Sequence, residues 1–191
     1  MRQIIATLCA LVATPAAAAC PVAADLEAGL RARLEATEVT LVISARDGTI
    51  LRDAPGLPGG QMRMAYLHPL LVSETGPAAA PTRYAYAADP APLDRLDELG
   101  RWQSGVTIAP AGAAVREGEV VVRYLGPSVA VAGACRYPAW EVSITVSVGW
   151  MAPLETRHIY APDLGLVTAS EVQGPMAALF PPMRLTEVAR R

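Results

Sequence analysis

Residues 140–150 alternate without a fault between apolar side chains and small or polar ones. The apolar set is Trp140, Val142, Ile144, Val146, Val148 and Trp150, with Glu141, Ser143, Thr145, Ser147 and Gly149 between them. Because successive side chains of a β-strand point to opposite faces of a sheet, this period of two predicts a strand. One of its faces is expected to be buried, and the other to meet water or a cavity.

Turn-forming residues divide much of the remaining chain into strands of the same kind. Asp47-Gly48 is typical of a hairpin turn, because glycine readily takes the positive φ that such a turn needs. Pro69 indicates a break or an edge position, and Gly126-Pro127 indicates an interruption. Further strands are predicted at residues 39–44, 49–52, 61–72, 82–87, 102–109, 118–125, 128–135, 155–160 and 166–172.

Two segments favour helical structure. In residues 22–35 the apolar positions recur every fourth residue, at Val22, Leu26, Leu30 and Leu34. This spacing predicts an amphipathic N-terminal helix, which Gly29 weakens. A shorter helical turn is expected over residues 89–99, where Gly100 would end it.

These elements predict a mainly β fold of the α+β class. We expect an antiparallel sheet of about seven to nine strands with one N-terminal helix. Residues 20–173 would form a single domain, and residues 174–191, which contain Pro181-Pro182, would be a loosely ordered tail.

The N-terminus is typical of a secretory signal peptide. A basic start is followed by an apolar run and then by small residues, which predicts that residues 1–19 are removed before Cys20. The apolar run is too short for a membrane span, and no later segment reaches that length. The mature protein is therefore expected in the periplasm or outside the cell.

Two cysteines remain after that cleavage, Cys20 and Cys135. In an oxidising compartment these two cysteines are expected to form one disulfide. The alternative is a lipoprotein anchored through Cys20, because Ala17-Ala18-Ala19-Cys20 resembles a bacterial lipobox. That pattern usually has leucine where this chain has Ala17, and lipidation would leave Cys135 without a partner.

Composition excludes several chemistries. All 16 basic residues are arginine and the chain contains no lysine, so a phosphate-binding loop of the Walker type and a Schiff base are impossible. The net charge is -2 and the arginines are scattered, so nucleic acid is not an expected partner. We expect no cofactor.

Candidate catalytic residues are few. His68 and His158 are the only histidines and lack metal-ligand spacing, so no metal site is predicted. No GxSxG motif provides a serine nucleophile, so no catalytic residue is assigned and a non-enzymatic role is favoured. A small hydrolase using His68 or His158 remains the alternative.

Aromatic side chains are the candidates for ligand binding. Tyr84 and Tyr86 share one face of a strand, and the tryptophans fall on other predicted strands. We expect the concave face of the sheet to hold an apolar or lipid-like ligand against these residues. Plain core packing explains the same residues equally well. The candidates are Tyr84, Tyr86, Trp102, Trp140 and Trp150.

Three stretches of the chain, residues 20–26, 135–137 and 160–167, resemble uncharacterised bacterial exported proteins. The resemblance implies an envelope location and a β-sheet, and it implies no activity. The hairpin at residues 160–165 is similar to one in periplasmic half-barrel folds, which implies a curved sheet or half-barrel wrapped partly around the helix. Together with the export signal it favours a binding or envelope-interaction module whose partner is a small apolar ligand or an envelope component.

Overall fold

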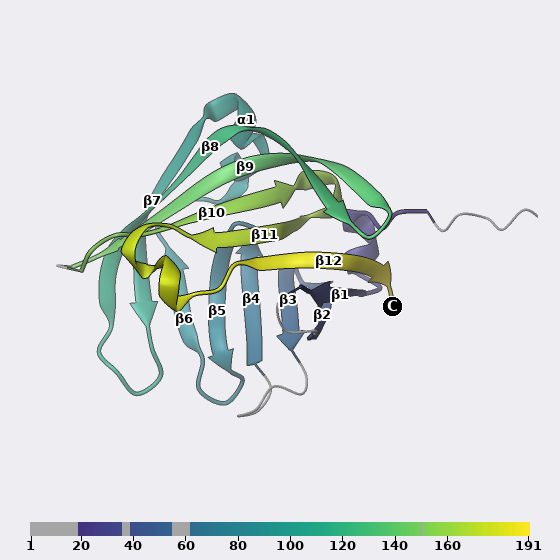
Figure 1. Cartoon of the computed structure of the whole chain (residues 1–191). Helices are drawn as coiled ribbons and strands as arrows, with labels where there is room; N and C mark the ends of the chain where they lie inside the picture. The colour runs from purple at the N-terminus through teal and green to yellow at the C-terminus, as the bar shows by residue number, and fades with distance from the viewer. Residues whose placement is uncertain (1–18, 36–38, 55–61, 150) are drawn as a thin grey trace, which may run out of the picture.

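The computed structural model describes residues 19–35, 39–54, 62–149 and 151–191. Within these ranges, twelve strands form one closed antiparallel barrel, and β1 closes it by pairing with β12 (Figure 1). In Figure 1, β8 to β11 fan across the upper part of the view and β3 to β6 run down its lower part. The strands are β1 (Leu30–Leu34), β2 (Thr40–Arg46), β3 (Thr49–Ala54), β4 (Met62–His68), β5 (Leu71–Pro77), β6 (Thr82–Tyr86), β7 (Arg101–Ala109), β8 (Arg116–Ala132), β9 (Cys135–Val148), β10 (Leu154–Ala161), β11 (Leu166–Val172) and β12 (Met183–Arg190).

Helical structure in the described residues is confined to segments of three to six residues. One four-residue α-helix, α1 (Leu96–Leu99), follows the 3-10 turn η2 (Ala91–Arg95), and Gly100 ends it in the left-handed conformation with φ of 70°. This confirms the helical turn predicted over residues 89–99. The other 3-10 turns are η1 (Ala23–Leu26), η3 (Pro162–Leu164) and η4 (Gly174–Leu179).

The predicted half-barrel of seven to nine strands with an N-terminal helix is wrong. Residues 22–35 hold η1 and then strand β1, with Gly29 between them at φ of 94°. A four-residue spacing of apolar side chains fits a strand as well as a helix, because four is a multiple of two. In β1, Leu30 and Ala32 are buried and alternate with exposed arginines.

The sequence pattern also did not predict the last strand, β12. Residues 174–191, expected to be loosely ordered, contain η4 and β12, and β12 pairs with both β11 and β1. Its buried residues, Leu185 and Val188, lie three positions apart. The pairing with β1 shifts register at Leu34, so the strand lacks the clean period of two that marks a strand in a sequence.

Strand β8 runs through Gly126-Pro127 instead of ending there. The pairing of β8 with β9 shifts register between Tyr124 and Gly126, so the expected interruption is a bulge inside one long strand. Pro69, in contrast, does mark a break, because β4 and β5 meet at the turn that contains it. The Asp47-Gly48 hairpin between β2 and β3 is confirmed, and both turn residues have positive φ.

Buried apolar side chains form two cores. The first, which we call the disulfide-end core, joins η1, η3 and the end of the β8–β9 hairpin to β1, β2 and β12. The second, the cap-end core, joins Leu93 of η2 and Leu96 of α1 to buried residues of the strands. It contains Leu70, Leu71, Leu93, Leu96, Trp102, Val106, Val120, Val122, Val142, Ile144, Tyr160 and Val167. The disulfide-end core contains Leu26, Leu30, Ala32, Leu41, Ile43, Ala130, Ala132, Tyr137, Ala139, Ala161, Leu164, Leu166, Leu185 and Val188.

Cys20 and Cys135 lie at bonding distance beside the disulfide-end core, with Cα atoms 5.6 Å apart and 115 positions apart in the sequence. The bond ties the N-terminal segment to the start of β9. Arg190 of β12 holds the same segment, because its guanidinium donates to the carbonyl oxygens of Ala19 and Cys20 and to Asp25. The predicted signal peptide, residues 1–19, lies outside the described residues except for Ala19.

Candidate functional site

A cavity of about 480 Å³ lies inside the barrel, and strands β3 to β12 all contribute to its wall. It borders the cap-end core, since Val106, Val120, Ile144 and Val167 belong to both. Sites for small ligands in proteins have volumes of roughly 300–1,000 Å³ and are mostly apolar, so this cavity has an appropriate size and lining.

The alternation along β9 explains why the cavity is apolar. Ile144, Val146 and Val148 take every second position of that strand and point into the barrel. Val120 of β8, Val106 and Ile108 of β7, and Leu71 and Val72 of β5 extend the apolar wall, and a few polar groups complete it. The remaining lining residues are Arg52, Met64, Tyr66, Pro69, Leu70, Thr75, Tyr84, Tyr86, Met151, Ala152, Leu154, Thr156, His158, Val167, Ser170 and Met183.

Tyr84 and Tyr86 of β6 both line this cavity. The Tyr86 hydroxyl donates to the carbonyl oxygen of Val72 at 2.8 Å, and its ring meets Trp102 edge to face at 6.3 Å. Burial raises the pKa of both tyrosine hydroxyls above the ordinary value. Tyr86 is therefore a fixed part of the wall, and both hydroxyls stay neutral at physiological pH.

The other predicted aromatics lie elsewhere. Trp102 is buried in the cap-end core, where its indole N–H donates to the Asp89 carbonyl oxygen at 2.9 Å. Trp140 packs edge to face against Tyr124 and Tyr160. Neither tryptophan lines the cavity, and Trp150 lies outside the described residues.

Arg52 of β3 is the polar residue that sequence analysis missed. It is 5% exposed, although its side chain lines the cavity. Its Nη2 donates to the carbonyl oxygen of Val167 at 3.0 Å, and its Cζ lies 4.9 Å from the centroid of the Tyr66 ring. Its Nε is buried with no hydrogen-bond partner, and no carboxylate in the described part of the chain forms an ion pair with it.

A sequence signal for Arg52 exists, but only once the pairing of β3 is known. Directly opposed residues in an antiparallel pair point to the same face of the sheet. Arg52 lies opposite Ile43, which is fully buried, and opposite Met64, which lines the cavity. The guanidinium therefore occupies a position on the inner face that would ordinarily be apolar.

His158 of β10 lies in the same wall. Its Nε2 is 2.7 Å from the Thr156 hydroxyl, and its Nδ1 is buried without a partner. Burial, and after it the positive charge of Arg52, lowers the pKa of His158 to about 4. At neutral pH the imidazole is therefore uncharged and acts as a hydrogen-bonding group.

His68 has a structural role outside the cavity wall. Its Nδ1 accepts from the Leu70 N–H at 3.2 Å, and its Nε2 lies 3.5 Å from Asp94 of η2. Burial lowers its pKa despite that carboxylate. His68 thus links the β4–β5 turn to the segment that covers the cap-end core.

The hydrolase alternative finds no catalytic arrangement in the described residues. A triad requires a nucleophile and a carboxylate on one histidine, but His158 has only the Thr156 hydroxyl, and His68 has only the Asp94 carboxylate. Ser104 is fully engaged, because its hydroxyl accepts from the Ala88 N–H and donates to the Gly105 carbonyl. Over the same residues, no group of three His, Cys, Asp or Glu side chains is arranged to hold a metal ion.

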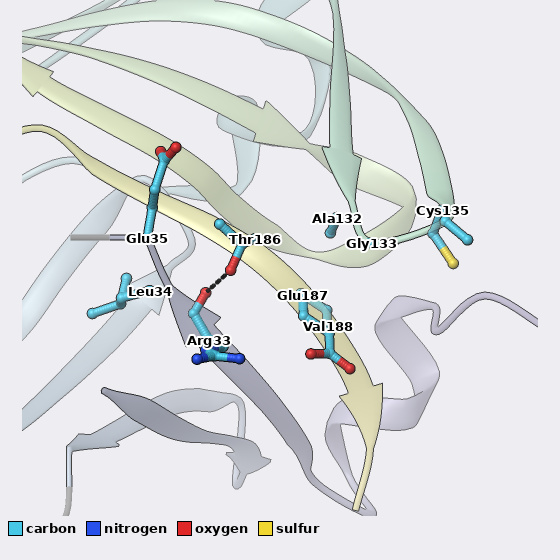
Figure 2. A pocket seen from close by; sticks show the side chains of 10 residues that line it. Arg33, Leu34, Glu35, Ala132, Gly133, Cys135, Thr186, Glu187 and Val188 are labelled. Carbon is cyan, nitrogen blue, oxygen red and sulfur yellow. Dashed lines mark hydrogen bonds between the residues drawn. The ribbon is translucent and has the colours of Figure 1, made fainter. Parts of the chain in front are cut away.

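A second hollow, of about 500 Å³, lies where the β8–β9 turn meets β1 and β12 (Figure 2). The Thr186 hydroxyl donates to the Arg33 carbonyl at 3.3 Å, and the Gly133 N–H donates to the Thr186 carbonyl at 2.7 Å. Its polar lining residues, among them Glu35 and Glu187, are exposed on the surface. Among the described residues that line this hollow, no polar group is buried without a partner, so the barrel cavity is the stronger candidate.

The barrel and its cavity define a class: a closed antiparallel β-barrel with an apolar interior pocket and one enclosed cation. Among solved structures, the chain is similar to the hypothetical lipoprotein YmcC from Escherichia coli (K12), with a TM-score of 0.53 and 11% identity over 85% of this chain and 86% of that one. At this identity the similarity concerns the fold. No protein-family model and no curated protein matches the chain.

None of the helices in the described residues is both long enough and apolar enough to cross a bilayer.

Proposed function

We propose that this chain is an exported, non-enzymatic binding protein whose barrel cavity holds an apolar ligand. The observation that carries the proposal is the cavity of about 480 Å³, walled mostly by apolar side chains from β4 to β12. Filling such a space with a ligand removes apolar surface from water, which is favourable by roughly 25 cal/mol per Å².

The test is binding of a neutral apolar probe, N-phenyl-1-naphthylamine, to purified protein extracted free of lipid. We expect its fluorescence to rise on binding with one site per chain. Ile108 lines the cavity from β7, so Ile108→Trp should fill part of the space and weaken binding at least about tenfold, or roughly 1.4 kcal/mol.

The matched control is Thr107→Trp, at the adjacent position of β7, because Thr107 lies outside the cavity lining. This variant should bind the probe as the unmodified protein does. Absence of saturable probe binding, or equal losses in the two variants, would contradict an interior ligand site.

Export and the state of Cys20 form the second part of the proposal. Cys135 lies at disulfide-bonding distance from Cys20, which supports a mature chain without a lipid anchor. One sulfur cannot carry both a disulfide and a lipid thioether. Intact mass of protein purified from its native envelope decides between the two states. An unacylated mass beginning at Cys20, with no free thiol, is the expected result, and added acyl chains with a reactive Cys135 would establish the lipoprotein instead.

A further inference from the structure

Arg52 is a cation enclosed in an otherwise apolar wall. A guanidinium stays protonated in proteins, so burial cannot neutralise it. An enclosed charge without a counterion is costly, and proteins ordinarily pair it with a carboxylate. In the described residues, the cavity wall contains no Asp or Glu, and the contacts of Arg52 there are one carbonyl oxygen and one aromatic ring.

Arg52 lines the cavity, and the described residues leave part of its hydrogen-bonding capacity unused. A guanidinium has five N–H donors in a planar fork, and its Nε–H here is buried without a partner. Such a fork matches the two oxygens of a carboxylate or phosphate. The bond from Nη2 to the Val167 carbonyl fixes the group between β3 and β11, so the fork is positioned before any ligand arrives.

His158 is a second residue of the cavity wall with an unpartnered hydrogen-bonding atom. Nδ1 of His158 is buried without a partner, and the ring is held from its other side by Thr156. Ser170 lies directly opposite His158 on β11 and also lines the cavity. The polar groups of the wall thus include one cation accompanied by neutral hydrogen-bonding side chains, and the rest of the wall is suited to a hydrocarbon chain.

We propose that the cavity takes an amphipathic carboxylate, with a hydrocarbon tail among the apolar residues of β5, β7, β8 and β9 and a carboxylate head bound to Arg52. The inference rests on the proposed function, because it names the ligand class of the same site. Arg52 is then the residue that determines specificity for an anionic head group.

The experiment measures displacement of N-phenyl-1-naphthylamine from the lipid-free protein at neutral pH by three ligands with the same tail. These are dodecanoate, dodecan-1-ol and dodecyl phosphate, each kept below its aggregation concentration. We expect dodecanoate to bind roughly 10- to 100-fold more tightly than dodecan-1-ol, the range typical of a charged hydrogen-bonded pair. This comparison needs no variant.

Arg52→Met removes the charge while keeping a long apolar side chain. It should abolish the preference for dodecanoate over dodecan-1-ol, and the readout is the ratio of these two affinities within the variant. Arg52→Lys keeps the charge but lacks the fork, so its preference should be intermediate. The control is Arg157→Met, beside His158 on β10, because Arg157 is exposed and pairs with Glu141 outside the cavity.

The outcomes separate this inference from the proposed function. Equal affinities for dodecanoate and dodecan-1-ol would overturn the anionic head group and leave an apolar-ligand protein. Tight binding of dodecyl phosphate without dodecanoate would replace the carboxylate by a phosphate. Failure of the neutral probe and of all three ligands to bind would refute the proposed function itself.

Discussion

The ionisation of His158 makes the stability of the folded chain depend on pH. Burial lowers its pKa from the ordinary 6.5 to about 4, so between these values the unfolded chain binds a proton that the folded chain does not. The free energy of unfolding therefore falls as the pH drops through this window. The loss attributable to His158 reaches about 3 kcal/mol once the pH is below 4.

His158→Leu should remove this dependence. From urea unfolding at pH 7 and pH 4.5, we expect the variant to lose about 2 to 3 kcal/mol less stability than the unmodified chain over that interval. Carboxylates such as Asp25, whose pKa is lowered by its hydrogen bond with Arg190, contribute to the acid loss in both proteins and cancel in the comparison. Identical losses in the two proteins would show that His158 is protonated in the folded state.

The sequence alone predicts the position of some residues of the cavity wall but not of others. Tyr84 and Tyr86 could be placed on one face of a strand, because their spacing of two sets the face regardless of partners. Arg52 and His158 could not be assigned to the inner face. Each is a polar residue on the inner face of its strand, and its direction follows from pairing with Ile43 and Val142 in neighbouring strands.

At the level of elements, the β8–β9 ladder depends on a glycine. A Cβ atom added to Gly118 would lie 2.2 Å from the Ser147 carbonyl oxygen, far inside van der Waals contact. A glycine inside a strand often marks such a close approach of another backbone. Gly118→Ala should therefore force the two strands apart and lower the free energy of unfolding by about 1–3 kcal/mol.

Gly105→Ala is the control for this change. Gly105 also lies within a strand, β7, but its added Cβ would meet only the Ala87 side chain at an ordinary 3.7 Å. Thermal or urea unfolding should show a much smaller change for this variant. Equal stability of the Gly118 and Gly105 variants would mean that the ladder can absorb the extra methyl group.

The elements that the sequence predicted correctly are those defined by local chemistry. Asp47-Gly48 specifies its own turn, and Gly100 ends α1 through a positive φ that glycine tolerates. The elements that it missed are defined by distant partners. Strand β1 needs β12 from the other end of the chain, and the bulge at Gly126 is visible only against its partner β9.

At the level of the whole molecule, closure of the barrel joins the two ends of the described chain. Strand β1 pairs with β12, and Arg190 of β12 bonds to the segment that contains Cys20. The Cys20–Cys135 bond then ties this junction to the start of β9. The bond lies at the disulfide-end core, whereas the cavity borders the cap-end core. Neither Cys20 nor Cys135 lines the cavity.

This separation predicts that the disulfide supports stability without shaping the ligand site. A cross-link between residues 115 apart restricts the unfolded chain, for which the entropy model gives at most about 4–5 kcal/mol. The double variant Cys20→Ser/Cys135→Ser should therefore unfold at lower urea concentration, while the folded variant binds N-phenyl-1-naphthylamine with unchanged affinity. An unchanged unfolding midpoint would contradict the stabilising role of the disulfide. A loss of probe binding in the folded variant would show that the disulfide also shapes the ligand site.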